Sequence, residues 1–341
     1  MPESNPLDIL ITIPLDPALI EKLQEVSPRL RVTVHPAKKM EDIPEDVWAR
    51  CEILYTLRVL PTIEMAPKLK WIQFHYAGIN HIVDDPIMQE KGLLVTTMSG
   101  ASVSQVSEHI LEMLLALGHR LPAIMESQNK AEWSEDRWKR FEPRELRDST
   151  VGIVGYGSIG RQVARLLHGF GATVLATKRD AMHPADRGYI PEGLGDPEGD
   201  YVHRLYPAQA IRSMVRECDF VVLTVPLTSS TRGLVDANVL AAMKPSAYLV
   251  DVSRGGVLDH DALIQALEDD QLGGAALDVF PEEPLSPGSP LWDIPNVIIT
   301  PHISGNSAHY AERAIELFAV NLGRYLGSQT LYNLFDAQRG Y

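Results

Sequence analysis

The sequence predicts an α/β protein with two domains, each containing a doubly wound parallel sheet. Two observations support this prediction. The chain has 341 residues, about twice the ~150 residues typical of one domain. Short apolar segments alternate with amphipathic ones along most of it, and this alternation is typical of parallel strands with helices on their faces.

The first hundred residues contain enough alternating segments for a small sheet of their own. Helices are expected over 17–26 and 84–91. Five apolar segments predict its strands, over 8–13, 30–33, 52–56, 71–74 and 94–96. A long helix is then expected over 104–120, because its apolar residues recur at helical spacing and would pack into a core.

A second, larger α/β unit begins at residue 149. Its helices are expected over 159–170 and 259–268. Its strands are expected over 150–154, 173–177, 220–225, 247–252, 274–278 and 297–300. Residues 181–207 interrupt this order with four prolines and four glycines. That density of turn formers predicts an irregular excursion on the surface.

Composition and charge exclude several classes of protein. Lys and Arg number 31 against 45 Asp and Glu, a net charge of −14, which disfavours nucleic-acid and membrane surfaces. No apolar run is long enough for a transmembrane helix, and the first residues lack the features of a signal peptide. Two cysteines cannot form a disulfide framework. We therefore expect a soluble cytoplasmic protein that binds neither nucleic acid nor membranes.

The segment 151–160, VGIVGYGSIG, indicates a dinucleotide site. Gly155, Gly157 and Gly160 form G-x-G-x-x-G between a predicted strand and a predicted helix. The three glycines permit the tight turn, the close approach of a pyrophosphate, and the packing of helix on strand. The pyrophosphate would bind the N–H groups at the start of the helix, including that of Ser158.

The residues after the next strand favour NADP. An NAD site carries an acid about 20 residues after the glycines, whereas this chain has Thr177, Lys178 and Arg179 there. These side chains could bind a 2′-phosphate, which a carboxylate would repel. A solvated basic turn beside Asp180 is the alternative interpretation, and NAD remains possible.

Three further stretches, 250–259, 276–284 and 291–305, each follow a predicted strand. They contain Arg254, Glu283 and His302, each of which could alone be an ordinary surface side chain. Their positions change this interpretation, because ligands bind outside the carboxyl ends of parallel strands. No metal site is expected, since HExxH is absent, and no G-x-S-x-G indicates a hydrolase.

Together these motifs resemble the D-isomer-specific 2-hydroxyacid dehydrogenase family, in particular its glyoxylate and hydroxypyruvate reductase branch. The resemblance extends over nearly the whole chain. It includes HYAGINHI (75–82), SQVSEHILEMLLALG (104–118), GYGSIGR (155–161), VPLTSSTRGLVD (225–236), SRGG (253–256), LDVFPEEP (277–284), TPHISG (300–305) and NLFDAQRGY (333–341).

The resemblance implies an architecture. Residues 1–103 and 305–341 would form a flavodoxin-like substrate domain, into which a Rossmann cofactor domain of residues 104–304 is inserted. The substrate would bind between the domains, which are expected to close on it. Family members build a two-fold dimer around the long helix, so a homodimer is expected.

The resemblance also implies site residues. Arg254, Glu283 and His302 match the catalytic Arg, Glu and His of the family. The N–H groups of Ala77 and Gly78 would bind the substrate carboxylate together with Arg254. The residues implied along the cofactor are Ile159, Val225, Pro226, Asp278, His302 and Ser304.

The residue types suit reduction of a 2-oxo acid. His302 can supply the proton to the carbonyl oxygen as a general acid, and a neighbouring Glu283 would favour its imidazolium form. The Arg254 guanidinium can hold the carboxylate and polarise the carbonyl.

The leading hypothesis is therefore a reductase of small 2-oxo acids such as glyoxylate or hydroxypyruvate that prefers NADP. An NAD-linked phosphoglycerate or other D-2-hydroxyacid dehydrogenase is the alternative among enzymes. From another class, a dinucleotide-sensing binding protein similar to the C-terminal-binding corepressors would share the fold. The sequence does not identify the acid. The excursion over 181–207 could cap the adenosine end of the cofactor or be neutral surface, and neutral surface is the favoured interpretation.

Overall fold

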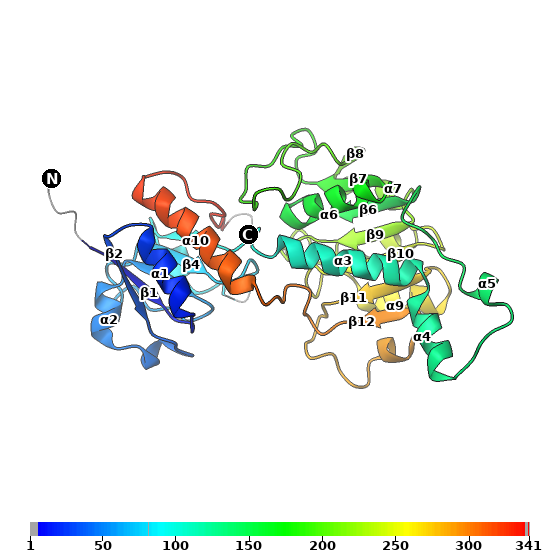
Figure 1. The fold of residues 1–341 in the computed structure, drawn as a ribbon, viewed down its shortest axis with the longest axis horizontal. Helices are drawn as coiled ribbons and strands as arrows, with labels where there is room; N and C mark the ends of the chain where they lie inside the picture. Colours follow the sequence, from blue (N-terminus) through cyan, green and yellow to red (C-terminus); the bar gives the residue numbers. More distant parts are fainter. Residues whose placement is uncertain (1–5, 81, 338–339, 341) are drawn as a thin grey trace. The chain divides into compact units, whose positions relative to one another are not determined.

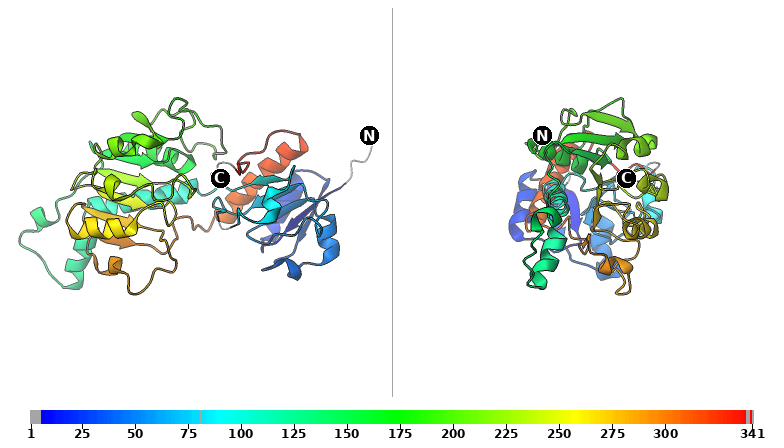
Figure 2. Two further views of the ribbon diagram at one scale, coloured as in Figure 1. Left: turned by 180° about the vertical axis from the view of Figure 1, so that it is seen from behind. Right: turned by 90° about the vertical axis from the view of Figure 1, so that its right-hand side faces the viewer.

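The computed structural model describes residues 6–80, 82–337 and 340. The chain divides into two compact units, Met1–Ser102 with Ser307–Tyr341 and Val103–Asn306, referred to below as unit 1 and unit 2 (Figures 1 and 2). The sequence places this division after residues 103 and 304. The segments 75–82 and 333–341 of the family resemblance each include residues outside the described ones.

Unit 1 contains a five-stranded parallel sheet of order β2-β1-β3-β4-β5, the order of flavodoxin-like sheets. The strands are β1 Leu7–Ile11, β2 Leu30–Val34, β3 Ile53–Thr56, β4 Trp71–Phe74 and β5 Leu94–Thr96. The helices are α1 Pro17–Glu25, α2 Glu45–Arg50 and α10 Tyr310–Leu326. The C-terminal part belongs to this unit, since the Phe335 N–H donates to the Val95 carbonyl at 2.8 Å.

Unit 2 contains a seven-stranded parallel sheet of order β12-β11-β10-β9-β6-β7-β8, the doubly wound order of dinucleotide-binding domains with one strand added. The strands are β6 Thr150–Val154, β7 Thr173–Lys178, β8 Arg204–Pro207, β9 Phe220–Leu223, β10 Tyr248–Asp251, β11 Gly274–Leu277 and β12 Val297–Ile299. The order reverses between β6 and β9, and ligands bind at the carboxyl ends on either side of such a reversal.

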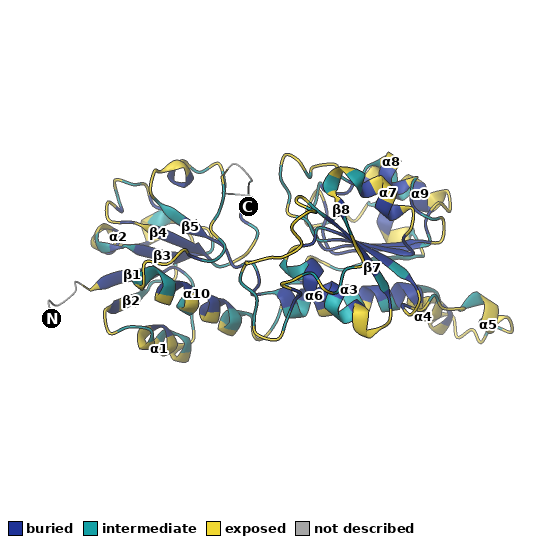
Figure 3. Cartoon of the chain, turned by 90° about the horizontal axis from the view of Figure 1, so that it is seen from above, coloured by how far each residue is buried: buried dark blue, intermediate teal, exposed yellow. Residues whose placement is uncertain are grey.

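Helices cover both faces of the unit 2 sheet, whose inner strands β6, β9, β10 and β11 are buried (Figure 3). One face packs against α3 Val103–Gly118 and α6 Ser158–Gly169. The other packs against α7 Ile211–Val215, α8 Ala237–Leu240 and α9 His260–Glu268. The helices α4 Leu121–Asn129 and α5 Arg137–Arg140 extend from α3 along an arm with many exposed side chains (Figure 3).

The predicted fold class is confirmed, and most predicted strands lie within two residues of the observed ones. The helix expected over 84–91 is wrong: Asp85 caps a short 3-10 helix, Pro86–Gln89, that ends after one turn. The segment expected to be irregular over 181–207 ends in strand β8, which pairs with β7. Among the described residues, no helix is long and apolar enough to cross a bilayer.

Candidate active site

The glycine loop lies between β6 and α6, and its three glycines have different surroundings. Gly155 has φ +105°, and a Cβ there would lie 2.7 Å from Val225 Cγ1. A Cβ on Gly160 would lie 2.3 Å from the Gly155 carbonyl oxygen. A Cβ on Gly157 would meet nothing within 4 Å. The first and third glycines therefore permit the turn and its packing, while the second borders open space of the kind that a pyrophosphate requires.

Neighbouring strand ends hold this loop in place. The Gly155 N–H donates to Thr177 Oγ1 at 3.2 Å, and Thr224 Oγ1 donates to the Gly155 carbonyl at 2.8 Å. Thr177 is buried, so its hydroxyl supports the loop. The predicted cofactor contacts Ser158, Ile159 and Val225 are half-buried and Pro226 is exposed; all four lie at the carboxyl ends of β6 and β9.

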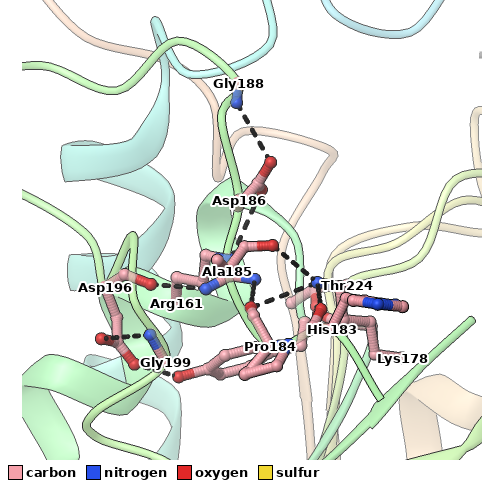
Figure 4. Close-up of polar contacts among 12 residues, drawn as sticks. Arg161, Lys178, His183, Pro184, Ala185, Asp186, Gly188, Asp196, Gly199 and Thr224 are labelled. Atoms are coloured by element: carbon pink, nitrogen blue, oxygen red, sulfur yellow. Dashed lines mark hydrogen bonds and ion pairs between the residues drawn. The ribbon is translucent and has the colours of Figure 1, made fainter. Parts of the chain in front are cut away.

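The two cations at the end of β7, Lys178 and Arg179, have different surroundings. Lys178 Nζ donates to the carbonyls of His183 and Ala185 at 2.5 and 3.0 Å, and to that of Pro184 at 3.2 Å (Figure 4). Burial lowers the pKa of the Lys178 ammonium, and the Arg161 guanidinium adds to the shift. The side chain of Arg179 is exposed.

His302 and Glu283 form a hydrogen-bonded pair. His302 Nδ1 lies 2.7 Å from Glu283 Oε2. The other carboxylate oxygen, Oε1, accepts the N–H of Phe280 at 3.0 Å. Both side chains are partly exposed. Because Nδ1 faces the carboxylate, Nε2 is the ring nitrogen that can exchange a proton with a ligand.

Asp278 holds the turn that carries His302. Its carboxylate is buried and accepts hydrogen bonds from the Thr300 hydroxyl at 2.6 Å and the Ile303 N–H at 2.9 Å. It also accepts the N–H of Ser304 at 3.0 Å. His302 itself has φ +53°, an uncommon backbone conformation for a residue with a Cβ. These hydrogen bonds offset its cost and position the imidazole.

Arg254 lies in the turn after β10. Its Nη1 donates to the Ser253 carbonyl at 2.6 Å. Burial lowers the pKa of its guanidinium, and the nearby Glu283 carboxylate opposes this shift. A Cβ on Gly255 would lie 1.9 Å from the Phe280 carbonyl oxygen, so only glycine lets the Arg254 turn approach the segment that leads to Glu283.

The structure thus places Arg254, Glu283 and His302 after three adjacent strands, β10, β11 and β12. They combine a cation that can bind an anion with a carboxylate–imidazole pair. All three lie at the carboxyl end of the sheet, as the glycine loop does. Such a set can hold a carboxylate and deliver a proton. Among the described residues, no group of three or more His, Cys, Asp or Glu side chains could hold a metal ion.

Sequence reasoning missed one charged residue beside this set. Asp251, the last residue of β10, is fully buried. Its Oδ1 accepts the N–H and hydroxyl of Ser253 at 2.9 and 2.5 Å, and its Oδ2 has no hydrogen-bond partner among the described residues. Burial raises the pKa of the Asp251 carboxyl to about 7. Its position at the end of a predicted apolar strand is the sequence feature from which a buried carboxylate could have been predicted.

In unit 1, Ala77 and Gly78 lie in the loop after β4, where Ala77 is exposed and Gly78 half-buried. The same loop begins with His75, whose Nδ1 lies 2.7 Å from the Tyr55 hydroxyl and whose carbonyl accepts the Tyr310 hydroxyl at 2.6 Å. Burial lowers the pKa of His75 to about 4, so its ring is neutral at physiological pH. These aromatic partners, also missed, fix the start of the loop.

Comparison with known proteins identifies the class to which this fold and site belong. Residues 111–304, more than half of the chain, match the family described as D-isomer specific 2-hydroxyacid dehydrogenase, NAD binding domain. A glyoxylate reductase from Pyrococcus furiosus is 32% identical over 291 residues, which cover 84% of this chain and 82% of that protein. The chain belongs to the D-isomer specific 2-hydroxyacid dehydrogenase family.

Two further relatives indicate the range of this family. An NADPH-dependent glyoxylate/hydroxypyruvate reductase from Sinorhizobium meliloti, solved in complex with NADP and sulfate, has a TM-score of 0.76 and 25% identity over 98% of this chain and 100% of that one. A D-3-phosphoglycerate dehydrogenase from Methanocaldococcus jannaschii is 34% identical over 90% of this chain. The chain covers only 55% of that enzyme's length.

Proposed function

We propose that this protein reduces small 2-oxo acids such as glyoxylate or hydroxypyruvate with NADPH. The observation that supports the proposal most strongly is the 2.7 Å contact between His302 Nδ1 and Glu283 Oε2. This pair lies at the carboxyl end of the sheet, where the glycine loop also lies. Two relatives are named for reduction of these acids. The exposed Arg179, which directly follows β7, supports NADP over NAD, and NAD remains the alternative cofactor.

In the proposed mechanism, His302 delivers the proton. A reduced nicotinamide, when bound, supplies the hydride to C2 of the oxo acid. The imidazolium of His302 donates its Nε2 proton to the carbonyl oxygen as negative charge develops there. The Glu283 carboxylate favours the imidazolium before transfer and orients the ring. The guanidinium of Arg254 binds the substrate carboxylate and polarises the carbonyl.

The remaining predicted site residues have supporting roles in this proposal. The N–H groups near the start of α6, with Ser158 and Ile159, would bind the pyrophosphate. Val225, Pro226 and Ser304 would line the cofactor. For Ala77 and Gly78, donation of backbone N–H groups to the substrate carboxylate rests on the family resemblance. A cytoplasmic location rests on composition.

The experiment follows the absorbance of reduced nicotinamide with NADPH or NADH and a panel of acids: glyoxylate, hydroxypyruvate, pyruvate, a branched-chain 2-oxo acid and a phosphorylated one. Turnover of the small acids with an NADPH advantage is expected. Turnover of the phosphorylated acid with NADH would favour the phosphoglycerate dehydrogenase alternative. Tight dinucleotide binding without turnover of any acid would favour the corepressor-like binding protein.

We also propose a homodimer. The arm after α3 exposes apolar side chains to a degree unusual for a monomer: Trp133 and Trp138 are 86% and 81% exposed. Leu121, Ile124 and Met125 of α4 are also exposed. The two-fold contact expected at the long helix over 104–120 lies directly before this arm in the chain, so a second copy of this chain is the proposed partner.

A further inference from the structure

The segment between β7 and β8, residues 181–203, is folded around one buried carboxylate. Asp196 Oδ1 accepts the N–H groups of Gly199 and Asp200 at 3.1 and 2.8 Å. Its Oδ2 accepts the N–H of Tyr201 at 3.0 Å and the hydroxyl of Tyr156. Asp196 is only 2% exposed. Residues 181–203, called the cap below, are therefore an organised element and not merely a loose excursion.

The cap is attached to the glycine loop and to α6. Arg161, the fourth residue of α6, is 1% exposed and donates to the carbonyls of Asp196 and Pro184 (Figure 4). Its Nε lies 3.4 Å from the Asp186 carboxylate, and its guanidinium lies 4.6 Å from the centre of the Tyr156 ring. Tyr156 stands between Gly155 and Gly157, so the residues that hold the cap are those of the dinucleotide fingerprint.

Lys178 also holds the N-terminal part of the cap, where Arg161 contacts Pro184. The three carbonyls around Nζ belong to consecutive cap residues, His183, Pro184 and Ala185. An ammonium group has three N–H donors, so these carbonyls satisfy its full donor capacity. A phosphate could be bound by Lys178 only if some of these hydrogen bonds were broken.

We propose that Lys178 is a positioning residue that holds the cap beside the end of β7, and that Arg179 is the residue that binds the 2′-phosphate of NADP. In a doubly wound sheet the ribose 2′ position lies at the end of the second strand, here β7. The exposed Arg179 directly follows that strand, and its planar guanidinium suits a phosphate. The cap then forms a fixed wall of the adenosine site. This inference rests on the proposed NADP preference and revises the role expected for Lys178.

The test compares Lys178→Met and Arg179→Gln by the Kd of NADPH and of NADH, with hydrogen exchange of the cap amides as a second measurement. Lys178→Met is expected to weaken both dinucleotides by a similar factor, about tenfold, because the wall is lost for both. Amides of Asp186, Gly195 and Gly199 should exchange faster in this variant. Lys178→Arg, which can still donate to carbonyls, should restore both properties. Arg179→Gln should weaken NADPH alone, by about tenfold or more, with cap exchange unchanged.

Selective loss of NADPH binding in Lys178→Met, with unchanged exchange in the cap, would overturn the inference and make Lys178 a phosphate ligand. Unchanged binding and exchange in that variant would overturn it as well. If the wild type binds NADH as tightly as NADPH, the proposed cofactor preference and the role of Arg179 both fail. The exchange data and an equal loss in Lys178→Met would in that case still support the positioning role.

Discussion

At the scale of single residues, the site depends on carboxylates whose partners differ. Glu283 accepts hydrogen bonds from an imidazole and from the Phe280 N–H, and Asp278 is fully engaged by the turn that carries His302. Asp251 is buried beside them, and among the described residues its carboxylate accepts hydrogen bonds only from Ser253. The three carboxylates are therefore expected to respond differently to pH and to substitution.

Asp251→Asn is expected to stabilise the protein at high pH. Its pKa is raised from the ordinary value to about 7, so the folded state binds the proton more tightly than the unfolded state. Stability is therefore fully present near pH 4 and is lost as pH rises towards 7. The variant removes this loss, with an upper bound of about 4 kcal/mol above pH 7.

Urea unfolding of both proteins between pH 4 and 8 measures this effect. Asp270→Asn makes the same change at an exposed position and should leave the pH dependence of unfolding as in the wild type. Equal free energies of unfolding for the wild type and Asp251→Asn at pH 8 would show that Asp251 carries no such cost.

Glu283→Gln is expected to slow reduction. The amide can still accept the Phe280 N–H, but the negative charge 2.7 Å from the imidazole of His302 is lost. The value of kcat/KM should therefore fall about tenfold, because the proton donor is less well oriented and stabilised. Steady-state kinetics with glyoxylate and NADPH measure it. An unchanged kcat/KM would exclude this role for Glu283.

At the scale of elements, the glycine loop and α6 allow a paired test. Gly157→Ala should leave the melting temperature near that of the wild type, since a Cβ there meets nothing, but should weaken dinucleotide binding by about tenfold or more because it occupies the pyrophosphate space. Gly160→Ala should lower stability by ~1–3 kcal/mol, since its Cβ approaches the Gly155 carbonyl.

Thermal melts and dinucleotide titrations of each variant separate the two effects. Gly169→Ala lies in the same helix, where a Cβ meets nothing within 4 Å, and should lower neither property, since alanine favours a helix more than glycine does. Retained dinucleotide affinity in Gly157→Ala would place the pyrophosphate elsewhere.

The elements that sequence analysis predicted are those with a strong pattern. Buried parallel strands are continuous apolar runs, and β4, β5 and β6 were predicted with their observed bounds. The short helices α7 and α8 have five and four residues, too few for a helical period. Strand β8 was not predicted, because Pro207 and the glycines that precede the strand are residues typical of turns.

The proposed catalytic residues of the candidate site were predictable from the sequence, whereas the contacts of the cap were not. Arg254, Glu283 and His302 follow strands directly, so the rule for parallel sheets brings them together. The partners of Arg161 lie more than 20 residues away in the chain, and no periodic pattern connects them. The carbonyl partners of Lys178 could not be predicted either. Every residue has a backbone carbonyl, so the residue types do not indicate which carbonyls accept its hydrogen bonds.

At the scale of the whole molecule, the arm of α4 and α5 predicts the oligomeric state. The chain should elute as a dimer, and replacing Ile124 and Met125 together by Glu should yield monomers, because two charges cannot be buried in an apolar contact. Light scattering after size-exclusion chromatography measures the mass. Met182→Glu changes another exposed methionine, 85% exposed in the cap, and should remain dimeric. A monomeric wild type would contradict the proposed dimer.

The proposed role of His302 as the proton donor in reduction of a 2-oxo acid is tested most directly by the kcat of His302→Ala with glyoxylate and NADPH. We expect a loss of about 10²- to 10⁴-fold in kcat, with the Kd of NADPH close to that of the wild type. Turnover at the wild-type rate in this variant, with NADPH binding intact, would contradict it.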